Sequence, residues 1–399
     1  MGRPRVAYIT SRMPAPAMSG GQLREFHLIS RLGLDFDIDL WVATMFPDIC
    51  AAAVPGMEQH CASVHLYRTD PPDGRPTDVS QRVWQQRSEQ MTRDLSDSLR
   101  DRPADVVHAE GYYVMQHLPR DLTTPVMLVE ENIEYLIDRQ WGDLLPDSPE
   151  HAGWSHAVEA ERAQWRRAAL CGVVSEDDRQ HIQMVVPDLD PVYVPHGCDH
   201  LAVLRPGAER AADALDGDAP IVTFVGNYTY PPTHDAALFL LEEIWPKVAA
   251  GHPTVRLSVV GQGVDQDLRD LAAGAQRVDV LGFVPSLGDV LDRTAVFVCP
   301  LRVGGGVKLK MLEAVVRGVP LVTTPVGAQG FPAELLAAMD VTSDPGGMSR
   351  AVLALLDDAG QRSERSRTLR TAARSLPTWE SASLALSRAW TSLIGTVGR

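Results

Sequence analysis

The chain has 399 residues, which exceeds the size at which one hydrophobic core usually divides, so two domains are expected. A net charge of −15 argues against nucleic acid as the main partner and against broad adhesion to anionic lipid. No apolar run approaches the length of a transmembrane span. The five cysteines are scattered without metal-ligand spacing, which fits the reducing cytoplasm and predicts no metal site.

The first half of the chain alternates short apolar runs with helical patterns. A loop rich in Pro, Ser and Gly, residues 11–21, follows the first apolar run, and Leu23, Phe26, Ile29 and Leu32 then recur at helical spacing. A largely polar helix is expected at 77–102. The strands expected in this half are 5–9, 38–43, 63–67, 105–110, 125–130 and 171–175, and a long helix is expected at 150–170.

A second alternating run follows a polar segment that ends at Pro220 and is the candidate linker. Strands alternating with helices in both halves predict two parallel, doubly wound sheets, which bind ligands beyond the carboxyl ends of their strands. The glycines at 20–21 and at 304–306 both lie at such ends, one in each half, so we expect a cleft between two facing domains. The expected strands are 221–225, 255–260, 278–281, 295–299 and 320–324, and the expected helices are 235–250, 308–317 and 348–357.

The most informative segment is the glycine-rich stretch Val303-Gly-Gly-Gly-Val-Lys-Leu-Lys-Met-Leu-Glu-Ala314. Its glycines allow the backbone to approach a ligand, and the free N–H groups of the following helix favour a phosphate or a sugar hydroxyl. Glu313 would accept hydrogen bonds from the two hydroxyls of a nucleotide ribose. The alternative is a plain strand, loop and helix in which Glu313 forms a structural salt bridge.

Several segments together resemble the GT-B glycosyltransferases of family 4, over essentially the whole chain. The segments that carry the resemblance are Ser19-Gly-Gly-Gln-Leu-Arg24, Asp105-Val-Val-His-Ala-Glu110, Glu130-Glu-Asn-Ile-Glu-Tyr135, the hinge Val194-Pro-His-Gly-Cys-Asp199, Phe224-Val-Gly-Asn-Tyr-Thr-Tyr-Pro-Pro232, Val259-Val-Gly261, Leu281-Gly-Phe-Val284, the glycine-rich stretch, and Gly318-Val-Pro-Leu-Val-Thr323.

The resemblance implies an α/β, GT-B fold with two facing Rossmann-like domains. Residues 1–200 would bind the acceptor, residues 219–375 would bind a nucleotide sugar, and residues 376–399 would form a helix that crosses back to the first domain. It also implies retaining transfer of a hexose-type sugar without a bound metal. Glu313 matches the residue that binds the ribose, the backbone at Phe283 and Val284 matches the part that contacts the base, and Gly20 and Gly21 match the loop that approaches the donor phosphates.

Two sugar-binding positions depart from the common family pattern. Many members carry a second Glu eight positions before Glu313, where this chain has Gly305. Many also carry His-x-His at the end of the fourth strand, where this chain has His108 and Glu110. Glu110 would accept a donor-sugar hydroxyl or deprotonate an acceptor hydroxyl. His108 is either a catalytic group or a satisfied core histidine.

The diphosphate site departs as well, because Asn227 and approximately Pro232 stand where the family commonly has Arg and Lys. A family branch with the Gly-Gly-Gly-x-Lys-x-Lys pattern is similar in all three respects. The charge of a departing diphosphate still has to be met. Lys308 is the first candidate and Lys310 the next, although Lys310 could instead pair with Glu313. The nucleotide-binding candidates are Gly20, Gly21, Arg24, Gly226, Asn227, Phe283, Val284, Arg302, Gly304, Gly305, Gly306, Lys308, Lys310 and Glu313.

For Arg24 a solvated helix face is an equal alternative. An acidic group at Glu130, Glu131 and Glu134 would suit an acceptor rich in amino or hydroxyl groups, or would simply be a solvated helix start.

The sequence therefore predicts a retaining glycosyltransferase that uses a nucleotide diphosphate sugar, with UDP or GDP as the expected nucleotide. The acceptor would be a hydroxyl-bearing small molecule, a natural product or a cell-surface glycan. Glu110, His108 and Lys308 are the predicted catalytic residues. Two alternatives remain: a nucleotide-sugar 2-epimerase of the same fold, and a non-catalytic member that binds nucleotide sugars.

Overall fold

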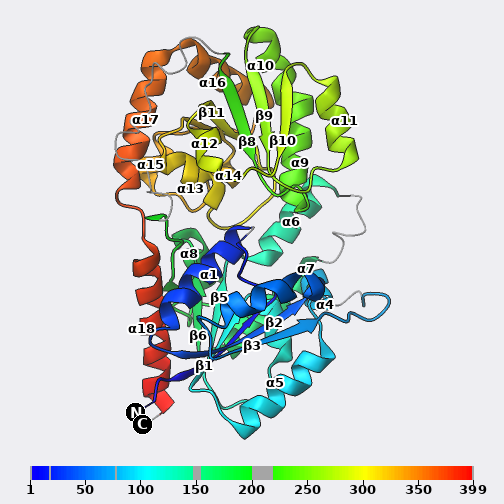
Figure 1. The fold of residues 1–399 in the computed structure, drawn as a ribbon, viewed down its shortest axis with the longest axis vertical. Coiled ribbons are helices and arrows are strands. Elements are labelled where there is room, and N and C mark those ends of the chain that lie inside the picture. Colours follow the sequence, from blue (N-terminus) through cyan, green and yellow to red (C-terminus); the bar gives the residue numbers. More distant parts are fainter. Residues whose placement is uncertain (1, 18, 77–78, 147–153, 200–218, 398–399) are drawn as a thin grey trace. The chain divides into compact units, whose positions relative to one another are not determined.

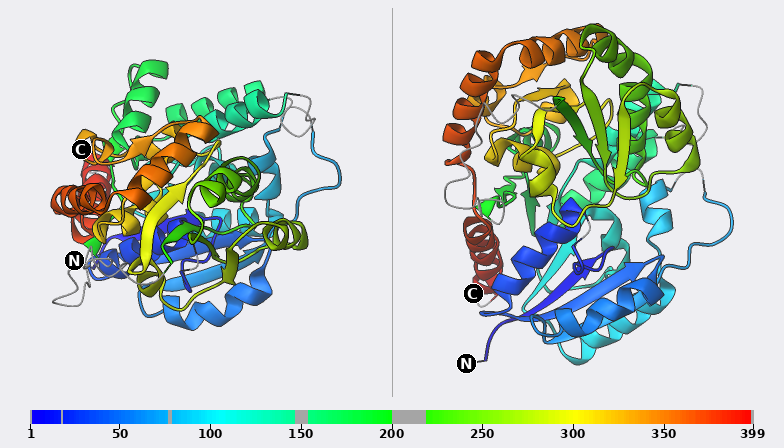
Figure 2. Two further views of the ribbon diagram at one scale, coloured as in Figure 1. Left: turned by 90° about the horizontal axis from the view of Figure 1, so that it is seen from above. Right: turned by 45° about the horizontal axis from the view of Figure 1, so that its top comes forward.

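The computed structural model describes residues 2–17, 19–76, 79–146, 154–199 and 219–397. The chain divides into two units by its internal contacts: unit 1 comprises Met1–Gly197 and Thr378–Arg399, and unit 2 comprises Cys198–Pro377. The polar segment expected as a linker lies almost wholly outside the described residues, as do residues 150–153 of the expected helix 150–170. Each unit is built on one parallel sheet, with helices on both faces (Figure 1; Figure 2).

Unit 1 contains a seven-stranded sheet with two buried faces, and successive residues of a strand point to opposite faces. Ala7 and Ile9 join one hydrophobic core and Val6 and Tyr8 join the other, so the first strand is apolar throughout. The strands are β1 (Arg5–Thr10), β2 (Asp37–Thr44), β3 (Ser63–Arg68), β4 (Val106–Glu110), β5 (Val126–Glu130), β6 (Leu170–Val173) and β7 (Val192–Tyr193), in the order β3-β2-β1-β4-β5-β6-β7.

The helices of unit 1 include the last helix of the chain. It packs against the first helix and contributes the buried rings of Trp379 and Trp390 to the core of unit 1. The helices are α1 (Gly20–Leu32), α2 (Pro47–Cys50), α3 (Val54–Met57), α4 (Gln81–Gln85), α5 (Glu89–Asp101), α6 (Glu134–Leu144), α7 (Trp154–Arg167), α8 (Glu176–Val185) and α18 (Trp379–Val397), with the 3-10 turns η1 (Ala51–Ala53) and η2 (Tyr112–His117).

Unit 2 contains a six-stranded parallel sheet with the same kind of topology. Its strands are β8 (Ile221–Val225), β9 (Arg256–Val260), β10 (Val278–Gly282), β11 (Thr294–Cys299), β12 (Leu321–Thr323) and β13 (Asp340–Val341), in the order β10-β9-β8-β11-β12-β13. Its helices are α9 (Pro231–Phe239), α10 (Trp245–Gly251), α11 (Gln266–Gly274), α12 (Leu287–Leu291), α13 (Leu309–Val316), α14 (Pro325–Ala328), α15 (Ala333–Leu336), α16 (Pro345–Asp357) and α17 (Ala359–Ala373), with the π-helical turn η4 (Leu240–Ile244).

The strand orders define where each unit can bind a ligand. The order in which the parallel strands are connected reverses between β1 and β4 in unit 1 and between β8 and β11 in unit 2. In open parallel sheets, ligands bind in the crevice beyond the carboxyl ends at such a switch point. Functional side chains are therefore expected at these two points.

Three helix predictions were wrong in detail, one of them only at its start: the helix expected at 348–357 begins at Pro345. The polar helix expected at 77–102 is two helices, α4 and α5, because Ser80 and Ser88 each cap a new N-terminus with the side-chain oxygen. The helix expected at 235–250 begins earlier, at Pro231, whose fixed φ suits the first helical position. It also contains the η4 turn before α10.

The chain enters and leaves unit 2 at neighbouring points. The backbone N–H of Cys198 donates a hydrogen bond to the carbonyl of Pro377 at 3.0 Å. Inside unit 1, Gly197 lies against the backbone of Trp379, where a Cβ atom would come within 2.2 Å of the Trp379 nitrogen. The segment before the first crossing and the start of α18 therefore meet.

Candidate functional site

The glycine-rich loop of unit 2 follows β11, at the switch point of the sheet. Gly306 has φ +59°, a left-handed conformation that favours glycine. Helix α13 begins at Leu309, one residue later than expected, and Lys308 takes the N-cap position. The Lys308 side chain turns back over the loop, and its ammonium donates a hydrogen bond to the carbonyl of Gly306 at 2.7 Å. Lys308 is 8% exposed. Its ammonium places a positive charge at this loop, and its hydrogen bond to Gly306 holds the loop in place.

Lys310 reaches in another direction, toward the end of β8. Its Nζ lies 3.5 Å from Thr233 Oγ1 and 5.1 Å from the centre of the Phe224 ring. A Cβ atom on Gly226 would lie 3.3 Å from the same Nζ, so the ammonium lies against the loop that follows β8. Within the described residues no ion pair joins Lys310 to Glu313 or to any other carboxylate. Burial lowers the pKa of Lys310, which is the mark of a cation without a compensating anion.

Glu313 lies one turn further along α13 and is half-buried. Burial raises the pKa of its carboxyl group, against the opposing charge of Arg317. The structural salt bridge considered as an alternative for Glu313 does not form within 4.0 Å among the described residues. Instead, Arg317 pairs with Asp292 at 2.8 Å.

Two further candidates of unit 2, Arg302 and Asn227, already have partners within the protein. Arg302 is bound to Asp235 through two nitrogens and lies over the Phe239 ring at 4.8 Å, so its charge is already compensated. Asn227 folds its side chain onto its own loop and accepts a hydrogen bond from the Thr229 hydroxyl at 2.8 Å.

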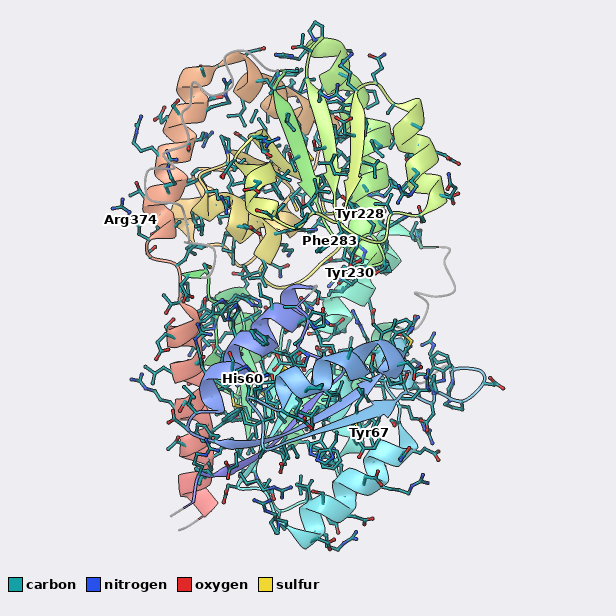
Figure 3. All side chains as sticks on the ribbon, in the orientation of Figure 1. His60, Tyr67, Tyr228, Tyr230, Phe283 and Arg374 are labelled. Carbon is teal, nitrogen blue, oxygen red and sulfur yellow. The ribbon has the colours of Figure 1, made fainter. Side chains whose placement is uncertain are left out.

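An exposed aromatic residue follows β10. Gly282 turns the chain with φ +66°, and the next residue, Phe283, is 63% exposed, whereas Val284 is half-buried against the core. Figure 3 shows Phe283 and Tyr230 near the same end of the unit 2 strands. The side chain of Phe283, and not just its backbone, is thus accessible to a ligand.

In unit 1 the predicted catalytic residues of β4 are buried. His108 is 0% exposed and Glu110 is 1% exposed. The indole N–H of Trp390 donates to His108 Nδ1 at 3.2 Å, so His108 carries its proton on Nε2 and donates it to Glu110 at 2.7 Å. Tyr8 also donates to Glu110, at 3.1 Å. The histidine is therefore a satisfied core group that connects α18 to the sheet.

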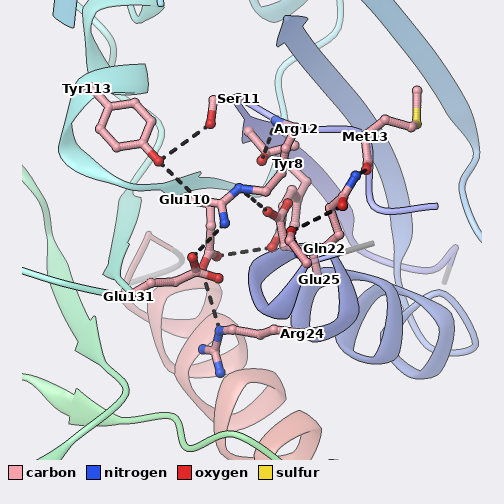
Figure 4. A network of polar contacts seen from close by, with 12 residues as sticks. Tyr8, Ser11, Arg12, Met13, Gln22, Arg24, Glu25, Glu110, Tyr113 and Glu131 are labelled. Atoms are coloured by element: carbon pink, nitrogen blue, oxygen red, sulfur yellow. Dashed lines mark hydrogen bonds and ion pairs between the residues drawn. The ribbon is translucent and has the colours of Figure 1, made fainter. Parts of the chain in front are cut away.

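Arg24 completes this buried network (Figure 4). Its Nε lies 3.5 Å from Glu110 Oε1, and its Nη1 donates to the carbonyl of Pro195 at 2.9 Å. Burial alone would raise the pKa of Glu110, but the hydrogen bond from His108 and the charge of Arg24 outweigh it and hold that pKa at about 2. A carboxylate with this pKa is a poor proton acceptor. The solvated helix face considered for Arg24 is wrong, because the side chain is 0% exposed.

A second group in unit 1 surrounds Arg12, which the sequence reasoning missed. Gly20 and Gly21 form the first turn of α1 and not a loop, with Ser19 as the N-cap. A Cβ atom on Gly21 would come within 1.6 Å of Arg12 Nη1, so Gly21 leaves space for this guanidinium. Arg12 bonds Glu131 at 2.8 Å and Tyr113 at 3.3 Å and pairs with Glu25 at 3.4 Å (Figure 4). Its place directly after β1 was the signal that could have identified it.

The acidic group expected at 130–134 is separated in the structure. Glu130 is buried and accepts hydrogen bonds from the Trp165 indole at 3.0 Å and the Tyr112 backbone at 3.3 Å. Glu134 pairs with Arg82 at 3.0 Å, whereas Glu131 binds Arg12. Only Glu131 of the three thus belongs to the group at the end of β1.

The architecture of two parallel Rossmann-like units with C-terminal helices is the GT-B fold. Residues 219–358, which form most of unit 2, match the family described as "Glycosyl transferases group 1". The chain is 29% identical over 194 residues to a phosphatidyl-myo-inositol mannosyltransferase of Mycolicibacterium smegmatis. That alignment covers 44% of this chain and 45% of the relative. An uncharacterised 44.6 kDa protein in the cps region of Klebsiella pneumoniae is 27% identical over 139 residues, which are 33% of this chain and 35% of the relative. The chain thus spans less than half the length of these relatives.

Solved structures support the fold over nearly the whole chain. A sucrose-phosphate synthase from Thermosynechococcus elongatus has a TM-score of 0.76 at 17% identity and covers 99% of this chain and 100% of its own. Anabaena HepE in complex with UDP and glucose has a TM-score of 0.68 at 12% identity and covers 98% and 100%. Among the helices of the described residues, none is long and apolar enough to cross a membrane.

Proposed function

We propose that this chain is a retaining glycosyltransferase that moves a hexose-type sugar from a nucleotide diphosphate sugar to a hydroxyl-bearing acceptor. The observation that carries the proposal is the switch point of unit 2, where the glycine loop, two lysines and Glu313 gather inside the segment that matches group 1 glycosyl transferases. UDP is the first nucleotide to test, because the similar HepE structure holds UDP. Natural products and cell-surface glycans are the acceptors to test.

Each side chain of the unit 2 site has a role in this proposal. Glu313 accepts hydrogen bonds from the ribose hydroxyls, and Phe283 covers the base. Lys310 and Lys308 stabilise the negative charge that develops on the departing diphosphate, so no metal ion is required. The bond between the sugar C1 and the diphosphate oxygen breaks, and the acceptor oxygen bonds C1 on the same face. The acceptor proton passes to the departing phosphate oxygen, which leaves the buried Glu110 with a positioning role.

Binding of a nucleotide diphosphate tests the first part of the proposal. A panel of UDP, GDP, ADP and dTDP is compared by thermal denaturation, in the presence of EDTA. The preferred nucleotide should stabilise the protein by about 2.7 kcal/mol at a hundredfold excess over its dissociation constant. Incubation with the donor sugar alone then separates the alternatives: an isomerised nucleotide sugar would identify an epimerase, and binding without turnover on any acceptor would identify a non-catalytic member.

Lys310→Met is expected to weaken UDP binding by roughly tenfold to a hundredfold while leaving uridine binding nearly unchanged, because a hydrogen bond to a charged group contributes about 1.5–3 kcal/mol. Burial lowers the pKa of the unliganded Lys310, and a bound diphosphate would raise it again. Binding of UDP should therefore take up protons at alkaline pH, and its affinity should fall as the pH rises. Calorimetry in two buffers of different ionisation enthalpy measures this uptake.

Lys308→Met is the matched control for Lys310, because it removes a neighbouring charge that is already bonded to Gly306. It should reduce turnover more than it reduces binding of the nucleoside monophosphate. Proton uptake should persist in Lys308→Met and disappear in Lys310→Met. Equal uptake in the wild type and Lys310→Met would show that Lys310 does not meet the diphosphate.

A further inference from the structure

We propose that unit 1 binds the acceptor at Arg12 and Glu131, and that the acceptor group bound there is an uncharged or cationic polyol and not a phosphorylated one. This inference rests on the proposed glycosyl transfer and names the acceptor class. The two residues lie at the carboxyl ends of β1 and β5, on the crevice side of the switch point between β1 and β4.

The guanidinium of Arg12 is held in place before any ligand arrives. Arg12 Nη1 donates a hydrogen bond to Glu131 at 2.8 Å, and Arg12 Nη2 donates one to the Tyr113 hydroxyl at 3.3 Å. Arg12 Nε forms an ion pair with Glu25 at 3.4 Å. Gly21 allows this position because it has no side chain. Three partners from α1, η2 and the segment after β5 thus fix one planar donor, which is the preorganisation that a specific binding site requires.

The charges around Arg12 are balanced, because Arg12 pairs with Glu131 and Arg24 pairs with Glu110, and no excess positive charge is left for an anion. Three carboxylates, those of Glu25, Glu110 and Glu131, surround the two guanidinium groups of Arg12 and Arg24. Glu25 is 0% exposed and pairs with Arg12 through Oε1, and burial raises the pKa of its carboxyl group well above the ordinary value, which favours the neutral form. A phosphate would place a second negative charge beside the accessible carboxylate of Glu131, whereas a hydroxyl or ammonium group would donate to that carboxylate.

The accessible edge of the group shows which atoms a ligand would meet. The Arg12 side chain is 28% exposed and that of Glu131 is 13% exposed, whereas Glu25 and Glu110 are buried beneath them. An adjacent guanidinium and carboxylate are complementary to a sugar hydroxyl, which accepts from the first and donates to the second. This arrangement favours neutral hydroxyls over anions.

Saturation-transfer NMR on the full chain with UDP bound tests the proposal. The ligands are three matched pairs: glucose and glucose 6-phosphate, glucosamine and glucosamine 6-phosphate, and myo-inositol and inositol 1-phosphate. We expect at least one unphosphorylated member to bind, roughly tenfold or more tightly than its phosphorylated partner. Arg12→Lys and Glu131→Gln should each weaken that binding by roughly tenfold, and Gly21→Ala should do the same by displacing Arg12.

Arg100→Lys is the control, because Arg100 forms an exposed ion pair with Asp97 on α5. It should bind every ligand as the wild type does. Tighter binding of the phosphorylated members, unchanged binding in both Arg12→Lys and Glu131→Gln, or no binding by any pair would overturn the proposal. UDP binding tests unit 2 separately. If the wild-type protein does not bind UDP, the proposed function is contradicted. Variants that still bind UDP but no longer bind the sugar support the acceptor site.

Discussion

Glu313→Ala is expected to weaken binding of UDP by roughly a hundredfold or more, because a carboxylate that accepts two ribose hydroxyls makes two charge-assisted hydrogen bonds of about 1.5–3 kcal/mol each. Glu313 is half-buried and has no salt bridge within 4.0 Å among the described residues, so its acceptor capacity is available to a ligand. Titration calorimetry with UDP and with 2′,3′-dideoxy-UDP measures the effect. The dideoxy ligand should bind the wild type and the variant equally.

Glu313→Gln separates the ribose contact from any loss of folding. Burial raises the pKa of Glu313, so the folded state favours its neutral form. That contribution to stability is present below the unfolded pKa and is lost as the pH rises through the folded pKa. Without ligand, the Gln and Ala variants should therefore be at least as stable as the wild type at neutral pH. UDP binding as tight as in the wild type would show that the ribose assignment is wrong.

Arg24→Met is expected to lower the free energy of unfolding of unit 1 by about 3–5 kcal/mol, because it leaves Glu110 as an uncompensated buried charge. Both side chains are at most 1% exposed, and Arg24 also bonds the Pro195 carbonyl. Nucleotide binding by unit 2 should be retained. Differential scanning calorimetry with and without UDP measures both. A stable Arg24→Met protein that has lost UDP binding would instead support the nucleotide contact predicted from the sequence.

The double variant Arg24→Met, Glu110→Gln is the control, because it removes both charges and should recover much of the lost stability. The pH dependence gives a second measurement. The folded pKa of Glu110 is lowered to about 2, so its contribution is present above the ordinary carboxyl pKa and is lost as the pH falls toward 2. Acid unfolding of the double variant should lack this component.

The parallel strands were accessible from the sequence, because buried parallel strands are short apolar runs between helical patterns. All five strands expected in the second half are present, with ends that shift by one residue or less. Helix ends were harder to predict. The break between α4 and α5 depends on which of several serines cap a helix, and such a choice is decided by packing of the flanking residues.

The candidate site was predictable from the sequence only in part. The glycine loop was predictable because its backbone requirement is written in one continuous segment. The partners of Arg24 and Arg12 were not, because they come from residues such as Pro195 and Glu131, which are distant in sequence. Arg24 and Glu25 are adjacent polar residues on a helix and look solvated in the sequence, yet both are completely buried beneath the end of β1. A charge pattern alone does not reveal which polar residues have buried partners.

The hydrogen bond between Cys198 and Pro377 has an evolutionary consequence. The first residue of unit 2 is hydrogen-bonded to its last residue, so the unit is an insertion whose two ends lie together. Such a segment can be exchanged between genes without distorting the unit into which it is inserted. Under the proposed function, recombination at 197–198 and 377–378 would replace the nucleotide site of unit 2 as one block while unit 1 is kept. New pairings of donor and acceptor would thus arise by exchange of a cassette, with no need for the two specificities to change together by point mutation.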